Sequence, residues 1–196
     1  MAFTDFTETN WTTGDTITAA LLDDLEKRAA GARATCQVYR ANVFPAAPGS
    51  FTTGGTVVDW EAEYWDNDSM FDLTTPGTTT KYVTIQQAGI YVMEATLAGL
   101  GSSSSNAFEI TIELNNVGGA FGGGQVLGAA TYQRTLTTPT AFFHQCRAVA
   151  DLSAADTIYV LVAAQTASQI DANVYGDAGD GCNFTVTMLA RNPAAT

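Results

Sequence analysis

The stretch Ala107–Leu114 reads AFEITIEL and alternates apolar and polar residues at every step. Successive side chains of a β-strand point to opposite faces, so this stretch is predicted to be a strand with one buried face. The residues expected on that buried face are Phe108, Ile110, Ile112 and Leu114. The residues expected to face water or a neighbouring element are Glu109, Thr111 and Glu113.

The same alternation recurs in Thr56–Tyr64 and in Phe184–Ala190. In the first of these, the inward positions are expected to be Val58, Trp60, Ala62 and Tyr64, and the outward ones Asp59, Glu61 and Glu63. In the stretch Ile90–Leu100, the positions expected on one face are Tyr91, Met93, Ala95 and Leu97.

Short strands separated by turn signals are typical of an all-β antiparallel sandwich. The predicted strands are Thr35–Val43, Thr56–Trp65, Lys81–Ile85, Ile90–Leu100, Ala107–Leu114, Gln125–Arg134, Ala141–Val149, Thr157–Gln165 and Asn183–Ala190. A break at Pro45, Pro48 and Gly49 is expected to follow the first of them.

The composition excludes several classes of protein. With 196 residues, of which 46% are hydrophobic, the chain can build a sizeable core. A net charge of −12 with only eight scattered Lys and Arg residues disfavours a nucleic-acid partner. No apolar run approaches the ~20 residues of a membrane span, so no membrane partner is expected. Met1–Asp5 shows no basic stretch before an apolar one, which predicts no secretory signal and synthesis in a cytosol.

The first 33 residues differ from the rest of the chain. A helix is predicted over Ala19–Ala30, with Thr18 as its N-cap and Gly31 just past its end. Such a short helix is marginal in water, so its apolar stripe must dock on another element or protein. We predict an attachment arm and helix over residues 1–33 and a jelly-roll head over residues 34–196. The residues expected to carry attachment are Phe3, Phe6, Trp11, Ile17, Leu21, Leu22 and Leu25.

No catalytic site is visible, so the chain is not predicted to be an enzyme. His144, the only histidine, lies in strand-like sequence and is interpreted as a satisfied strand residue, because no nucleophile motif accompanies it. The glycine-rich stretch Gly118–Gly124 is followed by neither Lys-Ser/Thr nor a helix, and is interpreted as a loop. The three cysteines, Cys36, Cys146 and Cys182, are expected to be buried and reduced.

Calcium is the one cofactor the acidic residues could suggest. The densest cluster comprises Asp59, Glu61, Glu63, Asp66, Asp68 and Asp72. Its Asp66–Asp68 turn could offer oxygens to Ca²⁺, but it lacks the glycine and closing glutamate of an EF-hand. The simpler interpretation is a solvated strand face and an Asx turn. Asp177 and Asp180 offer a weaker alternative. No cofactor is predicted.

The order of several segments resembles the globular head of complement C1q, a tumour-necrosis-factor-like jelly roll. The matching segments are Gly54–Asp72, Val83–Val92, Ile110–Asn116, Leu152–Val160 and Phe184–Leu189. Two positions depart from the family pattern: Ala155 and Asn116 each stand where glycine is usual. The resemblance implies a homotrimer whose apolar strand faces pack around a threefold axis.

A second resemblance lies in the stretch Trp11–Glu26. It is similar to the W-x-x-G-D-x-I-T-A-x-x-L-x-x-L-E opening of many tailed-bacteriophage virion proteins, which precedes a fibre or a knob. The resemblance implies a phage structural protein on the virion surface, either a capsid decoration or a head fibre. Its arm would then bind the major capsid protein or another virion protein.

The alternative function is that of a tail-fibre or receptor-binding module that recognises a host surface glycan. Loops on rigid β scaffolds usually carry recognition. The candidate loops are Asp66–Gly77, Gly99–Asn106, Gly118–Gly124 and Ser168–Gly181, and Tyr132 or Tyr175 could stack on a sugar ring. An enzyme such as a depolymerase lacks a supporting constellation of residues.

Overall fold

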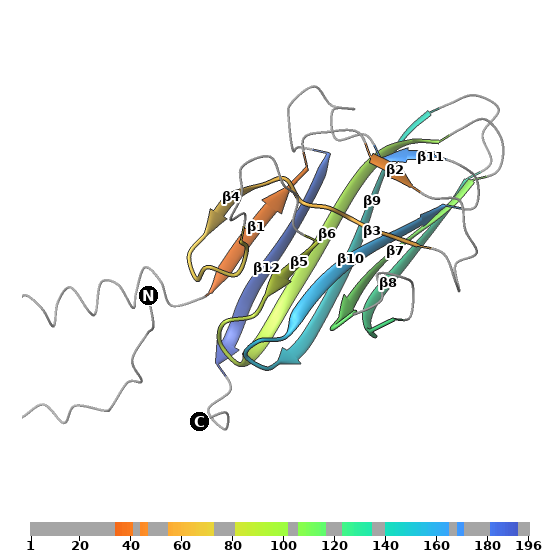
Figure 1. Cartoon of the computed structure of the whole chain (residues 1–196). Coiled ribbons are helices and arrows are strands. Elements are labelled where there is room, and N and C mark those ends of the chain that lie inside the picture. The colour runs from red at the N-terminus through yellow and green to blue at the C-terminus, as the bar shows by residue number, and fades with distance from the viewer. Residues whose placement is uncertain are drawn as a thin grey trace, which may run out of the picture.

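The computed structural model describes residues 34–40, 44–46, 55–72, 81–101, 106–116, 123–134, 140–164, 168–170 and 181–191. Every element in these ranges is a β-strand (Figure 1). The strands are β1 (Thr35–Tyr39), β2 (Phe44–Ala46), β3 (Thr56–Val57), β4 (Ala62–Asp66), β5 (Tyr82–Thr84), β6 (Gly89–Gly101), β7 (Asn106–Leu114), β8 (Gln125–Arg134), β9 (Thr140–Leu152), β10 (Thr157–Ala164), β11 (Ser168–Ile170) and β12 (Cys182–Arg191). The predicted arm and helix, residues 1–33, lie outside the described residues.

The strands form two sheets that pack face to face (Figure 1). The seven-stranded sheet has the order β2-β11-β6-β12-β1-β4, with β9 paired to β6. The five-stranded sheet has the order β3-β10-β7-β8, with β5 paired to β10. Neighbouring strands are mostly far apart in sequence and pair antiparallel, as in a jelly roll. The all-β antiparallel sandwich predicted from the alternation is therefore confirmed.

The core lies between the sheets and follows the predicted inward positions. On β7, Phe108, Ile110 and Ile112 are buried, and Leu114 packs against them half-buried. On β6, the four predicted inward residues are fully buried. Each of the larger apolar side chains among them contributes about 1.5–3 kcal/mol through burial. The outward positions of β7 were expected to face either water or a neighbouring element. Glu113 faces a neighbour, because its side chain is fully buried.

The predicted strand Thr56–Trp65 is wrong as a single element. Thr56–Val57 pairs with β10 in the five-stranded sheet, whereas Ala62–Asp66 pairs with β1 in the seven-stranded sheet. The chain crosses between the sheets through Trp60, which is fully buried and stacks on Phe184 with ring centroids 5.9 Å apart. The alternation over Thr56–Tyr64 therefore runs through two strands of different sheets and does not mark one continuous strand.

The inward position predicted for Tyr64 is also wrong, because its side chain is 46% exposed. The pairing of β4 with β1 shifts register between Gln37 and Val38, which makes a β-bulge. A bulge adds one residue to a strand and re-aims the side chains beside it. The ring of Tyr64 consequently lies against the ring of Tyr39 outside the core.

Two boundaries near the first strand also differ from the prediction. The strand predicted as Thr35–Val43 ends at Tyr39, and residues 41–43 lie outside the described residues. Pro45, predicted as a break, is the central residue of β2. Proline has no N–H for a sheet ladder, and it is tolerated here because β2 ends the strand order of its sheet.

The sandwich is closed along one side by a close approach of β8 and β9. A Cβ added to Gly128 would lie 2.7 Å from the carbonyl oxygen of Arg147 and 3.0 Å from the Cβ of Ala148. On the same pair of strands, Nε2 of His144 lies 3.0 Å from the carbonyl oxygen of Ala130. Only a residue without a side chain allows the two backbones to come this near.

A hydrogen-bonded turn ties the end of β7 to the β9–β10 connection. The Asn115 amide donates to Oδ1 of Asp156 at 3.0 Å, and its Oδ1 accepts from the Thr157 N–H at 2.8 Å. Ala155, in the middle of this turn, has φ = 72°. This left-handed conformation explains why glycine is usual at the corresponding position of the resembling family.

Candidate functional site

The attachment residues predicted from the sequence lie outside the described residues, so their places stay predictions. Two of the four loops proposed for recognition, Gly99–Asn106 and Ser168–Gly181, are partly strand. Gly99–Gly101 belongs to β6, Asn106 begins β7, and Ser168–Ile170 forms β11. Tyr132 belongs to β8, where its backbone pairs with Phe108. Tyr175, with residues 73–80, 102–105, 117–122 and 171–180, lies outside the described part.

The predicted interpretation of His144 as a satisfied strand residue is confirmed. It lies on β9 with the same facing as Cys146 and Ala148, and its ring is half-buried. Its Nε2 is hydrogen-bonded to a backbone carbonyl rather than to a hydroxyl or thiol nucleophile.

The three cysteines are free and buried, as predicted. Burial raises the pKa of Cys146 to about 11, against the smaller opposing effect of backbone hydrogen bonds from Ile112 and Arg147. Burial also raises the pKa of Cys36 strongly, and the carboxylates of Asp66 and Glu63 raise it further. A thiol with a raised pKa is a poor nucleophile, so these residues act as small apolar groups.

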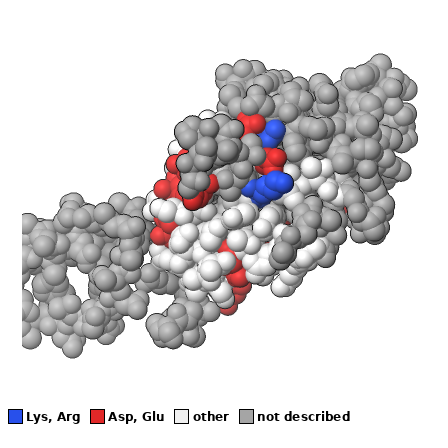
Figure 2. All heavy atoms as spheres, viewed as in Figure 1, with Lys and Arg blue, Asp and Glu red and all other residues white. Residues whose placement is uncertain are grey.

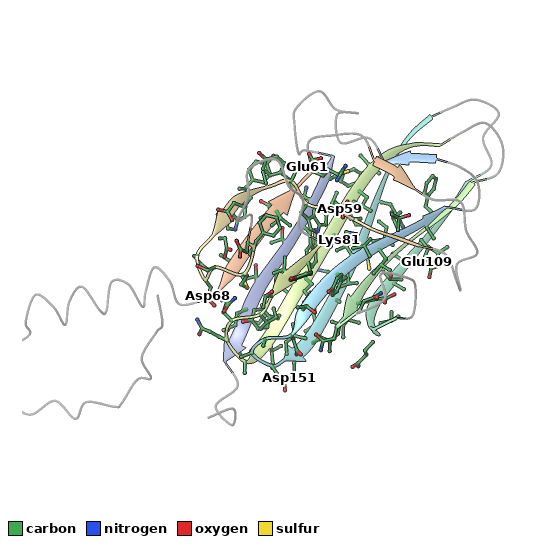
Figure 3. The ribbon with its side chains drawn as sticks, in the orientation of Figure 1. Asp59, Glu61, Asp68, Lys81, Glu109 and Asp151 are labelled. Atoms are coloured by element: carbon green, nitrogen blue, oxygen red, sulfur yellow. The ribbon has the colours of Figure 1, made fainter. Side chains whose placement is uncertain are left out.

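The acidic cluster that could have held calcium is dispersed. Figure 3 places Asp68 far from Glu61 along this side of the sandwich. Two of its carboxylates have local partners of their own: Asp66 accepts from the N–H of Phe71 at 2.8 Å, and Asp68 accepts from the Gln87 amide at 3.0 Å. Within the described ranges, no three Asp, Glu, His or Cys side chains gather as metal ligands. Asp177 and Asp180 fall outside these ranges.

A buried polar pair that the sequence did not reveal lies where the chain crosses between the sheets. Arg40, itself buried, donates to the carbonyl oxygen of Asp59 at 2.6 Å and lies 3.4 Å from Oε1 of Glu61. Oδ1 of Asp59 and Nε1 of Trp60 are buried without a hydrogen-bond partner. The Arg40 guanidinium holds the crossing segment against β1, which gives this cluster a structural role.

A second buried carboxylate fixes the start of the glycine-rich loop. Oε2 of Glu113 accepts from the Asn116 amide at 2.6 Å and from the Gly124 N–H at 3.3 Å, and Oε1 accepts from Thr111 at 3.2 Å. These bonds satisfy the carboxylate and draw the two ends of the loop together. Asn116, which stands where glycine is usual, is therefore used as a hydrogen-bond donor.

Exposed apolar side chains gather on the seven-stranded sheet. Six of the eight large hydrophobic residues exposed in the described part lie on its strands: Tyr64, Trp65, Ile90, Phe143, Val149 and Leu189. The other two are Tyr82 and Val126. No helix in the described part is long and apolar enough to cross a membrane.

One group of these residues forms a patch on the outer face of β6 and β9, which we call the β6–β9 patch. It comprises Ile90, Val149 and the half-buried Val92, which is paired directly with Val149. Phe143 lies six residues farther along β9, beyond the exposed Gln145 and Arg147. Val149 is 60% exposed. The ion pair between Glu94 and Arg147, 3.3 Å apart, lies on the same face. Such a patch on a well-packed sheet is typical of a protein–protein contact.

A second group lies at the other end of the sheet, which we call the β4 aromatic surface. It comprises Tyr39, Tyr64 and Trp65, with ring centroids 4.4 Å apart for the first two and 6.2 Å apart for the last two. Figure 2 shows acidic side chains gathered over this end of the molecule. The sheet therefore presents two exposed hydrophobic surfaces, one aliphatic and one aromatic.

Comparisons with known proteins establish the fold. No protein-family model and no curated protein sequence matches this chain. Among solved structures, the tumour necrosis factor Eiger from S. frugiperda is similar, with a TM-score of 0.52 and 14% identity over 84% of this chain and 97% of that one. The globular domain of zebrafish complement 1qA has a TM-score of 0.51 and 11% identity over 81% and 99%. The fold is a jelly roll of the C1q and tumour necrosis factor type, as expected.

Proposed function

We propose that this chain is a bacteriophage structural protein, a capsid decoration or head-fibre protein, whose jelly-roll heads form homotrimers on the virion surface. The observation that carries the trimer is the β6–β9 patch, an exposed apolar surface on a rigid sheet. Burial of its three large side chains would contribute several kcal/mol to association. A homotrimer is also what the resemblance to C1q-like heads implies. The phage role rests on the motif in Trp11–Glu26 alone.

The trimer is tested by light scattering on the purified chain with two matched substitutions. Val149→Asp places a charge in the β6–β9 patch and is expected to give monomers. Tyr82→Asp places the same charge on an exposed residue of the five-stranded sheet and is expected to leave the trimer intact. A native chain that is monomeric at every concentration, or two variants that dissociate equally, would contradict the proposal.

Attachment is tested by removing the first 31 residues, Met1–Gly31. The truncated chain is expected to fold and to remain trimeric but to be lost from purified particles. A truncated chain that stays on the particle would show that the arm is not the anchor. A reconstruction of the particle would then place the protein on capsid or tail, and a glycan array would test the alternative of host-glycan recognition.

A further inference from the structure

The start of β1 lies beside an exposed apolar corner of the seven-stranded sheet. The carbonyl oxygen of Ala34 accepts from the N–H of Met188 at 2.8 Å, so the chain enters β1 next to the end of β12. The register shift between Met188 and Ala190 makes Leu189 the extra residue of a bulge, and its side chain is 45% exposed. Ile90 of β6, which pairs with Ala190, is 41% exposed. We call the three exposed residues the β6–β12 corner: Ile90, Leu189 and Ala190.

The β6–β12 corner is continuous with a larger apolar surface. Figure 1 shows the start of β1, the end of β12 and the start of β6 at the same end of the sheet. Val92 is the next residue of β6 on the same face as Ile90, so the corner runs into the β6–β9 patch. On the other side of β1, the exposed Trp65 is paired with the polar Gln37. The apolar surface beside the start of β1 therefore extends mainly over β12 and β6.

The segment that precedes β1 in the sequence carries a matching apolar stripe. The helix predicted over Ala19–Ala30 places Leu21, Leu22 and Leu25 on one face. A helix of twelve residues is marginal in water, so it needs a surface on which to bury this stripe. Only the three residues Gly31–Arg33 separate it from the start of the described chain.

This short connection limits where the predicted helix can lie. The four Cα-to-Cα steps from Ala30 to Ala34 span at most about 14 Å, and part of that span is used to rise from the sheet to the helix. Neighbouring strands are about 4.8 Å apart, so β12 and β6 lie within this reach of β1, whereas β9 is three strands away. The last turns of the helix, which hold Leu22 and Leu25, therefore reach the corner before they reach Val149.

We propose that residues 19–30 dock as a helix on the β6–β12 corner of their own head, with the leucine stripe against Leu189 and Ile90. The contact goes beyond the proposed trimer and does not depend on it. Val149 lies on the far side of β6 and remains for the contact between heads, and Ile90 borders both contacts. Attachment to the particle then falls to the aromatic residues of the arm: Phe3, Phe6 and Trp11.

Hydrogen exchange of the full chain, followed by mass spectrometry, tests whether residues 19–30 are docked. A docked helix protects its amides, whereas an undocked helix of this length exchanges nearly as fast as an unstructured peptide. Leu189→Asp and Leu25→Asp each place a charge in the contact and are expected to speed exchange of residues 19–30 by about tenfold. Exchange of this segment in the native chain at the rate of an unstructured peptide would overturn the proposal.

Two matched variants control for the added charge. Ala20→Asp places the same charge on the side of the predicted helix opposite the leucine stripe. Tyr82→Asp places it on an exposed residue of the five-stranded sheet. Exchange of residues 19–30 should be unchanged in both, and equal acceleration in all four variants would refute a specific contact. Leu25 lies outside the described head, so Leu25→Asp decides the test even if Leu189→Asp fails to fold.

A disulfide shows which copy of the chain receives the helix. Leu22→Cys or Leu25→Cys, combined with Leu189→Cys, is expected to cross-link within one chain under mild oxidation. Ala20→Cys combined with Leu189→Cys is expected not to cross-link. The three native cysteines are free and buried, so they do not compete for the bridge. A cross-link between chains would mean that the helix docks on a neighbouring copy, and the proposal would be wrong.

A further outcome would place the helix elsewhere on its own head. If Trp65→Asp speeds exchange of residues 19–30 and Leu189→Asp does not, the helix docks on β4 and the β6–β12 corner is not its site. The Val149→Asp experiment is measured by mass in solution, so the trimer stands or fails separately from this contact.

Discussion

The strands β7 and β4 carry similar alternation in sequence and differ in what surrounds them. β7 lies between β10 and β8, so both of its edges are paired and one of its faces is covered by the opposite sheet. β4 ends the strand order of its sheet and is paired to β1 alone among the described strands. Its side chains are mostly exposed, whereas those of β7 are mostly buried.

This difference shows where an alternating pattern specifies a buried face. A strand held on both sides cannot shift or twist without moving its whole apolar set, so pattern and burial agree. An edge strand can take up a bulge, as β4 does, and then successive residues no longer alternate. An alternating pattern therefore determines which residues of β7 are buried, whereas in β4 the pairing with β1 determines it.

The sharpest way to test this contrast is the same substitution in both strands. Ile110→Asp would bury a carboxylate in the core, which costs more than about 4 kcal/mol even if the group is neutralised. We expect insoluble protein. Tyr64→Asp, on the exposed edge, should cost less than about 1 kcal/mol and leave a soluble chain. Yield and thermal melting measure both, and a normal melt for Ile110→Asp would contradict the assigned facing of β7.

The closed side of the sandwich next to β7 can be opened by one methyl group. Gly128→Ala would force β8 away from β9, because the added Cβ would meet the backbone of Arg147. Overpacking of this kind costs about 1–3 kcal/mol. Denaturant unfolding measures the loss. Ala129→Ser, at the next and exposed position of β8, should change stability by no more than about 0.5 kcal/mol and serves as its control.

The features that could be predicted from the sequence are those set by local alternation, and the features that could not are set by contacts between distant parts of the chain. The core positions of β6 and β7 followed from the two-residue period alone, since both strands are held by neighbours on each side. The crossing at Trp60 could not be predicted, because it is set by pairing with β10 and β1, over a hundred residues apart in the chain. The β4 aromatic surface was missed for the same reason. One signal could have found it: two adjacent aromatic residues within an alternating stretch.

The end of β7 offers a smaller test of local backbone strain. Ala155→Gly should stabilise the fold by about 0.5–1 kcal/mol, because an L-residue in the left-handed region is strained and glycine is not. For a chain of this size, that raises Tm by about 1–4 °C. Ala154→Gly, at the neighbouring exposed position, should lower Tm instead, since it only adds freedom to the unfolded chain. If both variants shift Tm in the same direction, strain at Ala155 is not the cause.

The smallest effect on stability is expected on the edge strand β4, where the change removes a charge and leaves the core packing unaltered. The pKa of Glu63 is raised in the folded chain, first by burial and then by Asp66, so its charged form is disfavoured there. That cost is present at neutral pH and disappears as the pH falls through the folded pKa and the carboxylate is protonated. Glu63→Gln should therefore raise Tm by about 1–2 °C at pH 7 and by nothing near pH ~3. A gain that persists in acid would mean that the glutamine makes a new contact, and the repulsion between Glu63 and Asp66 would no longer explain it.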